Sequence, residues 1–116
     1  MEVTRYFTDA DGVTRFEKMD PVQHERWSKA QPGSIGVRQL DAGTAMEWHP
    51  APRRQIVIHL AGQLEIQLED GTTHRYGPGD ARLMEDLTGK GHLTSVIGDE
   101  PVVQAVIVLS EAAGSS

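Results

Sequence analysis

The chain has 116 residues, 38% of them hydrophobic, which suffices for one domain with a single core. It has no cysteine, which excludes disulfides and thiolate metal sites, and its net charge of -6, without a basic stripe, argues against nucleic-acid binding. No apolar run reaches the length of a membrane helix and the N-terminus lacks a signal-peptide pattern, so we expect a cytoplasmic protein with no membrane partner.

One short helix is predicted ahead of most of the strands. Asp20 can cap it, Pro21 suits its first position because proline lacks an amide hydrogen, and Gln23 can complete a capping box. The helix has to end before Pro32-Gly33, because neither residue continues a helix well. The sequence therefore predicts at most one short helix, between residues 20 and 32.

Short strand patterns, separated by glycine-containing turns, fill the rest of the chain. Gln55–Leu60 is rich in β-branched residues, as buried strands are, whereas the next segment alternates apolar Leu64 and Ile66 with polar Gln63 and Glu65. This pattern is typical of an all-β sandwich or barrel. The predicted strands are Ser34–Leu40, Gln55–Leu60, Leu64–Leu68, Arg75–Leu83 and Val102–Leu109.

Three candidate metal ligands lie near these strands. His49 and Gln55 flank a bend at Pro52, and strand alternation gives both side chains the same parity. We expect the bend to bring them together on neighbouring strands, which lie ~4.8 Å apart. His92 would arrive from a third strand. Two histidine nitrogens and one amide oxygen would suit iron, manganese, zinc, nickel or copper.

The segments around these residues resemble a known family. WHPAPRRQ at residues 48–55 and EDLTGKGH at residues 85–92 are similar to motifs of small single-domain bacterial cupins, and the likeness runs from about Ser34 to Leu109. It implies an all-β cupin fold, a double-stranded β-helix or jelly-roll barrel, at residues 34–110. Residues 1–33 would be an N-terminal extension packed on the barrel or on a dimer partner, and residues 111–116 a disordered tail. A homodimer is implied because cupins often pair.

The match to the cupin metal motifs is incomplete. Aligned on Gly62, His49 takes the place of the first histidine, Ala51 that of the second and Gln55 that of the glutamate, while His92 fills the histidine of the second motif. The resemblance thus implies a metal site at His49, Gln55 and His92. An amide lacks the charge of a carboxylate, so we expect weaker binding than in a complete site. The sequence leaves open whether a divalent transition metal is bound, and no organic cofactor is expected.

Two further residues are candidates for acid–base catalysis. His59 has the parity of Gln55 but lies ~13 Å farther along the strand. It is either a catalytic group deep in the pocket or a buried histidine bonded to a neighbour. Asp86 is a general base, a carboxylate that orients a metal-bound histidine, or a solvated acid at a strand end. His74 follows a turn and is expected at the surface.

Arg53 and Arg54 are expected at the mouth of the barrel. Either could hold a substrate carboxylate or phosphate, because a guanidinium can bind such a group through two parallel hydrogen bonds. The alternative is that both form salt bridges with acids at the rim, such as Glu85 or Asp86. The two arginines are therefore candidates for substrate binding.

The expected function is that of an enzyme acting on a small organic substrate inside the barrel. The resemblance implies oxygenase, isomerase, cyclase or lyase chemistry, with a metal as Lewis acid or dioxygen anchor. Without a metal, the histidines would act as acid and base. One alternative is a non-catalytic cupin that binds a small ligand and keeps a degraded metal site. A structural dimer without pocket chemistry is the other.

Overall fold

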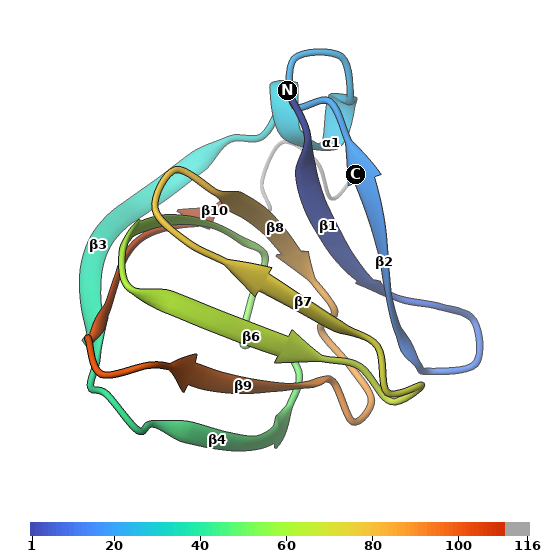
Figure 1. Ribbon diagram of the computed structural model, residues 1–116. Helices are drawn as coiled ribbons and strands as arrows, with labels where there is room; N and C mark the ends of the chain where they lie inside the picture. Colours follow the sequence, from blue (N-terminus) through green and yellow to red (C-terminus); the bar gives the residue numbers. More distant parts are fainter. Residues whose placement is uncertain (111–116) are drawn as a thin grey trace.

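Two β-sheets face each other and form a barrel, with a hairpin of the first two strands on one side (Figure 1). The computed structural model describes residues 1–110, so the predicted tail at 111–116 lies outside the described residues. The elements are β1 Val3–Thr8, β2 Thr14–Met19, α1 Glu25–Ser28, β3 Pro32–Leu40, β4 Ala45–His49, β5 Gln55–Ala61, β6 Gln63–Gln67, β7 Thr73–Tyr76, β8 Ala81–Glu85, β9 His92–Ile97 and β10 Val102–Leu109.

The strand order in the two sheets is that of a jelly roll. The larger sheet has the order β2-β1-β8-β5-β10-β3 and the smaller one β4-β9-β6-β7. All pairs are antiparallel except β1 with β8. Because most successive strands from β3 onward alternate between the sheets, residues far apart in sequence meet inside the barrel. The predicted all-β fold with at most one short helix is confirmed.

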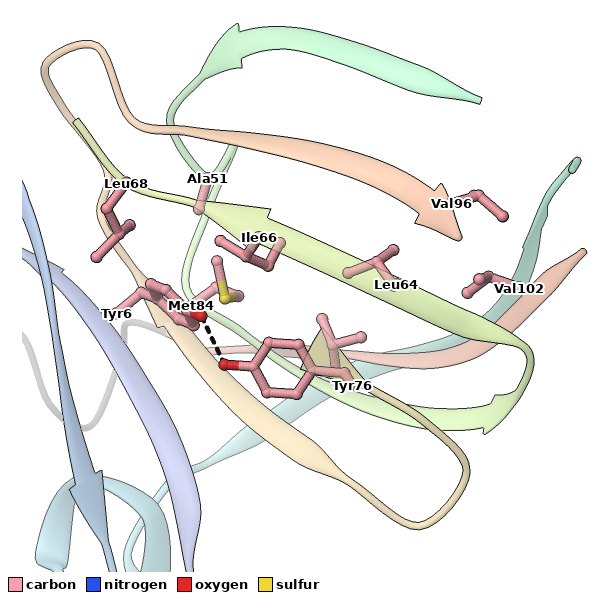
Figure 2. Close-up of a cluster of buried hydrophobic side chains, with 10 residues drawn as sticks. Tyr6, Ala51, Leu64, Ile66, Leu68, Tyr76, Met84, Val96 and Val102 are labelled. Carbon is pink, nitrogen blue, oxygen red and sulfur yellow. Dashed lines mark hydrogen bonds between the residues drawn. The ribbon is translucent and has the colours of Figure 1, made fainter. Parts of the chain in front are cut away.

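The main hydrophobic core fills the space between the sheets (Figure 2). Leu64 and Ile66 of β6 are fully buried, as their alternation with polar residues predicts. Tyr6 of β1 enters the same core, and its hydroxyl is hydrogen-bonded to that of Tyr76. The N-terminal hairpin therefore contributes to the barrel core.

Two predicted elements differ from the structure by more than two residues. Arg75–Leu83 is not one strand, because the glycine-proline turn at 77–80 divides it into β7 and β8. The helix begins at Glu25 rather than near Pro21, and His24 caps it by accepting a hydrogen bond from the amide of Arg26. Asp20 instead closes a turn, where its carboxylate accepts from the amide of Val22.

The edges of the larger sheet are β2 and β3. On β3, Ile35 and Val37 are 71% and 68% exposed. β1 pairs with β8 of the same chain, so the hairpin packs on its own barrel. The homodimer stays a prediction.

Within residues 1–110, no helix has the length and apolar character needed to span a membrane.

Candidate functional site

His49, Gln55 and His92 line one small cavity of about 40 Å³ inside the barrel. His49 on β4 and His92 on β9 are direct partners in the strand register, and their ring centroids are 4.9 Å apart. Gln55 comes from β5, in the larger sheet. The expectation that His49 and Gln55 lie on neighbouring strands was therefore wrong, because the segment between them crosses from one sheet to the other. The side chains meet across the barrel.

Hydrogen bonds fix the orientation of both imidazole rings. Nδ1 of His49 lies 2.7 Å from the backbone oxygen of Glu47. Since a carbonyl oxygen only accepts, Nδ1 carries the hydrogen and Nε2 keeps its lone pair. Nδ1 of His92 lies 2.6 Å from Oδ2 of Asp86, and the carboxylate favours the same tautomer there. Both rings therefore keep Nε2 for a further partner.

Asp86 lies behind His92 and is fully buried. Its Oδ2 also accepts a hydrogen bond of 3.1 Å from Oγ1 of Thr14, on the N-terminal hairpin. Its backbone oxygen accepts from the amide of Ala51 at 2.8 Å. Asp86 is not among the described residues that line the cavity, so this geometry suits a positioning residue for His92 better than a general base.

Gly91 lets the loop before β9 pass close to His49. Gly89 and Gly91 have φ of 78° and 79°, a backbone conformation that favours glycine. A Cβ on Gly91 would lie 2.0 Å from the backbone oxygen of His49. A side chain at this position would therefore push apart the strands that carry the two histidines.

Replacing Gly91 with alanine is expected to destabilise the protein by about 2 kcal/mol or more, because strain at positive φ adds to a backbone clash. The matched control is Gly71→Ala, which has the same strain at φ 88° but no atom within 4 Å of the added carbon. Chemical denaturation of both variants measures the difference. Equal losses of stability would contradict the close approach of Gly91 to His49.

His59 lies deeper than the cavity and is hydrogen-bonded within the core. Its Nε2 accepts a hydrogen bond of 3.1 Å from Nε of Arg82, and its ring stacks on Tyr76. Burial, followed by the charges of Arg82 and Arg38, lowers the pKa of His59 to about 3. A ring that stays neutral and accepts from arginine fits the buried, hydrogen-bonded alternative rather than a catalytic acid or base.

Arg53 and Arg54 have different environments. Arg53 is exposed and lines a wider hollow of about 290 Å³ beside β3, next to Gln55. Arg54 points to the outer side of the larger sheet, where its Nε donates to Glu85 at 2.6 Å. Of the two arginines, only Arg53 is placed near the cavity mouth, and its role in binding stays a prediction.

Glu85 is a buried carboxylate that binds three arginines. Arg5 and Arg54 donate to it at 2.6 Å each, and Arg26 donates through two nitrogens. Burial raises the pKa of Glu85, but the hydrogen bonds from Arg26, Arg5 and Arg54 outweigh it and hold that pKa at about 2. This cluster joins the N-terminal hairpin, α1 and the barrel.

The sequence did not single out Arg38 and Arg82, which line the cavity together with the predicted ligands. Arg82 is only 3% exposed although it lies in the middle of β8. The available signal was its parity, which it shares with buried Met84. His74 was expected at the surface but is half-buried against Phe16, with ring centroids 3.9 Å apart.

Comparison with known proteins identifies the fold. No family model and no curated protein matches the chain. A cupin 2 conserved barrel domain protein from Salinispora arenicola is 19% identical, with 67% of this chain and 63% of that chain covered and a TM-score of 0.53. An uncharacterised protein with a double-stranded β-helix domain from Klebsiella pneumoniae is 22% identical, with 69% of each chain covered and a TM-score of 0.52. The chain has a cupin fold.

One similar protein has a named activity. It is the DMSP lyase DddQ from Ruegeria pomeroyi, which is 28% identical over 68% of this chain, with a TM-score of 0.53. The match covers 39% of the lyase chain, and less than two thirds of the Salinispora chain. These likenesses establish the barrel that surrounds the cavity, and the roles of the individual residues follow from their own geometry.

Proposed function

We propose that this cupin barrel is a metal-dependent enzyme for a small organic substrate, with a divalent transition metal bound by His49, Gln55 and His92. The observation that best supports this proposal is the pair of histidines that face one cavity. Each ring has its Nδ1 engaged by an acceptor behind it, which is the arrangement of metal-binding histidines in proteins.

The donor set fits a transition metal, though without a carboxylate. Within residues 1–110, no group of three or more His, Asp or Glu side chains is placed to hold a metal ion. A site here therefore needs the amide oxygen of Gln55 beside the two imidazoles. Neutral imidazole suits zinc, copper, iron and nickel, and an amide oxygen is a weaker ligand than a carboxylate. We expect a site of moderate affinity with positions left for the substrate.

A metal bound here would supply a Lewis acid that polarises a substrate oxygen. The chain itself would shape the pocket and orient the ligands. Met46, Met84 and Ala51 give the cavity an apolar wall that limits access of water. Asp86 holds the ring of His92 in one tautomer. The likeness to a lyase supports an enzyme of this general kind.

A second candidate is a cupin that binds a small ligand without turnover. The observation that favours it is the lining of the cavity, in which none of the described residues is an aspartate or glutamate. With His59 bonded to Arg82 and Asp86 bonded to His92, no carboxylate among residues 1–110 is placed to act as a general base on the ligand. Turnover would then have to rely on His49, His92 or water. Assays with small organic substrates in the presence of the metal would separate the two functions.

Removal of either histidine is expected to abolish metal binding. Protein purified without chelators would be analysed for bound metal and titrated with Mn²⁺, Fe²⁺, Ni²⁺ and Zn²⁺ while its melting temperature is followed. His49→Ala and His92→Ala should each lose the thermal shift, and Asp86→Asn should weaken binding roughly 10- to 100-fold.

The control is His24→Ala, because His24 caps α1 and does not line the cavity. Its metal binding should match that of the unaltered protein. If either cavity variant bound metal as tightly as the control, or if no ion shifted the melting temperature of the unaltered protein, the proposed metal site would be wrong.

A further inference from the structure

Polar side chains form a row across the inner face of the larger sheet. Gln104 on β10 is the register partner of His59 on β5 and of Arg38 on β3. Nε of Arg38 donates to Oε1 of Gln104 at 2.7 Å, and Nε of Arg82 on β8 donates to His59 at 3.1 Å. Both ends of this row, Arg38 and Arg82, line the cavity beside the candidate metal ligands.

The two arginines of this row have no carboxylate partner among residues 1–110. None of the ion pairs there includes Arg38 or Arg82. Their hydrogen bonds go to neutral acceptors, the ring of His59, the amide of Gln104 and the sulfur of Met84, which is a weak acceptor. Burial lowers the pKa of Arg82 to about 10, so its guanidinium is still charged at neutral pH.

On the outer face of the same sheet, the arginines are paired with a carboxylate. There Arg5, Arg26 and Arg54 share the carboxylate of Glu85. A buried charge is costly unless an opposite charge compensates it. The fold supplies such a charge for the outer arginines, whereas within the described residues no carboxylate forms an ion pair with Arg38 or Arg82. The charge of Asp86 acts on Arg82 without a direct hydrogen bond, since its Oδ2 is bonded to His92 and Thr14.

Three buried side-chain atoms lack a hydrogen-bond partner among the described residues, namely Nε2 of His74, Oδ1 of Asp86 and Nε2 of Gln104. Because arginine only donates, the oxygen of Gln104 has to face Arg38, which explains why its Nε2 is the unpaired atom. None of these residues lines the cavity, so it is the two positive charges of Arg38 and Arg82 that favour a ligand that accepts hydrogen bonds and carries negative charge.

We propose that the cavity binds the carboxylate group of a small organic acid between Arg82 and Arg38, next to His49, Gln55 and His92. A planar carboxylate matches the fork of a guanidinium. A cavity of about 40 Å³ has room for this group and roughly one or two further heavy atoms. This inference names the substrate class of the proposed site. It rests on the proposed function only where it places the reacting end of the acid next to the candidate metal ligands.

The rest of the acid would lie in the hollow along β3. That hollow, of about 290 Å³, shares Arg38, Pro52 and Gln55 with the cavity. Its other lining includes Val106 and Val108, so it suits a short aliphatic chain better than a polar one. The preferred ligand is therefore an aliphatic carboxylic acid rather than a phosphate.

The test is calorimetric titration with butyrate, and with the neutral butyramide as its isostere. Butyrate should bind and butyramide should not. Arg82→Met should weaken butyrate binding at least tenfold while the melting temperature of the free protein stays the same or rises, because a buried charge without a carboxylate partner has been removed. Arg75→Met, on the exposed face of β7, should bind butyrate like the unaltered protein.

Arg38→Met keeps the test decisive if Arg82→Met does not fold, because Arg38 lies on an edge strand. Equal binding of butyrate and butyramide, or butyrate binding that neither arginine variant weakens, would overturn the inference. Each titration is run on the protein as purified and after removal of metal. Arginine-dependent binding without any metal site would refute the proposed function alone, and metal binding with arginine-independent butyrate binding would refute this inference alone.

Discussion

Replacing Glu85 with glutamine is expected to lower the free energy of unfolding by about 3 kcal/mol. Glutamine keeps the size of the side chain but removes the charge that Arg5, Arg26 and Arg54 share. The guanidinium groups of Arg5 and Arg54 are mostly buried, so water replaces the lost interaction poorly. Urea or guanidinium unfolding, followed by circular dichroism, measures the loss.

The same cluster predicts how stability depends on pH. The pKa of Glu85 is about 2 in the folded state and near its ordinary value of 4.5 when unfolded. The stability that Glu85 contributes is therefore fully present above pH ~4.5 and is lost as the pH falls through ~2. His59, with its pKa of about 3, adds a loss that begins near pH 6.5. Glu85→Gln should flatten only the lower part of this decline.

Glu65→Gln is the control for Glu85→Gln, because Glu65 forms one ion pair with an exposed arginine. Such pairs contribute roughly 0–1 kcal/mol. If Glu85→Gln cost no more than Glu65→Gln, or if its stability below pH 4.5 fell as steeply as that of the unaltered protein, the three-arginine cluster would not be a major source of stability.

Replacing Gln55 with glutamate is expected to raise the affinity for divalent metal roughly tenfold or more. The substitution changes the amide into a carboxylate of nearly the same shape, beside His49 and His92. A full negative charge in a buried site attracts a divalent cation far more strongly than an amide dipole does. Competition with a metal-binding dye measures the change for Mn²⁺, Ni²⁺ and Zn²⁺.

The substitution also has an effect of the opposite sign. A glutamate at position 55 would pair with Arg38 or Arg82, which line the same cavity, and so compete with an added carboxylate. Gln55→Glu should therefore weaken butyrate binding while it strengthens metal binding. Gln23→Glu, at an exposed position far from the cavity lining, should change neither. Unchanged metal affinity in Gln55→Glu would remove Gln55 from the candidate ligands.

Local sequence patterns predicted two kinds of strand, those with one exposed and one buried face and those made mostly of apolar residues. Val102–Leu109 has the predicted bounds, and Leu64 and Ile66 of β6 point inward. For β4 and β9 no strand bounds were predicted from the sequence, although His49 and His92 were expected on strands. β4 has no fully buried position, and it is held by its pairing with β9, which pairs with β6 on its other side. This pairing is a property of the fold rather than of a local pattern.

The sequence predicted which residues form the candidate site but not how they are arranged. His49, Gln55 and His92 meet in one cavity, but from opposite sheets, because the loop after His49 crosses the barrel. The tautomers depend on the carbonyl of Glu47, two residues before His49, and on the carboxylate of Asp86, which the loop before β9 brings next to His92. The sequence did not single out Arg82 because an arginine in a strand is ordinarily at the surface, and the parity that it shares with Met84 is a weak signal against that tendency.

The hydrogen bond from Thr14 to Asp86 links the N-terminal hairpin to the ring of His92. A fragment that begins at residue 34 would keep every candidate metal ligand. It would lose the hydrogen bond from Thr14 to Asp86, and it would lose Tyr6 from the core. The hairpin and the barrel therefore share one core and one buried hydrogen-bond network. Local opening of the first two strands would loosen His92 before any strand of the barrel itself had separated.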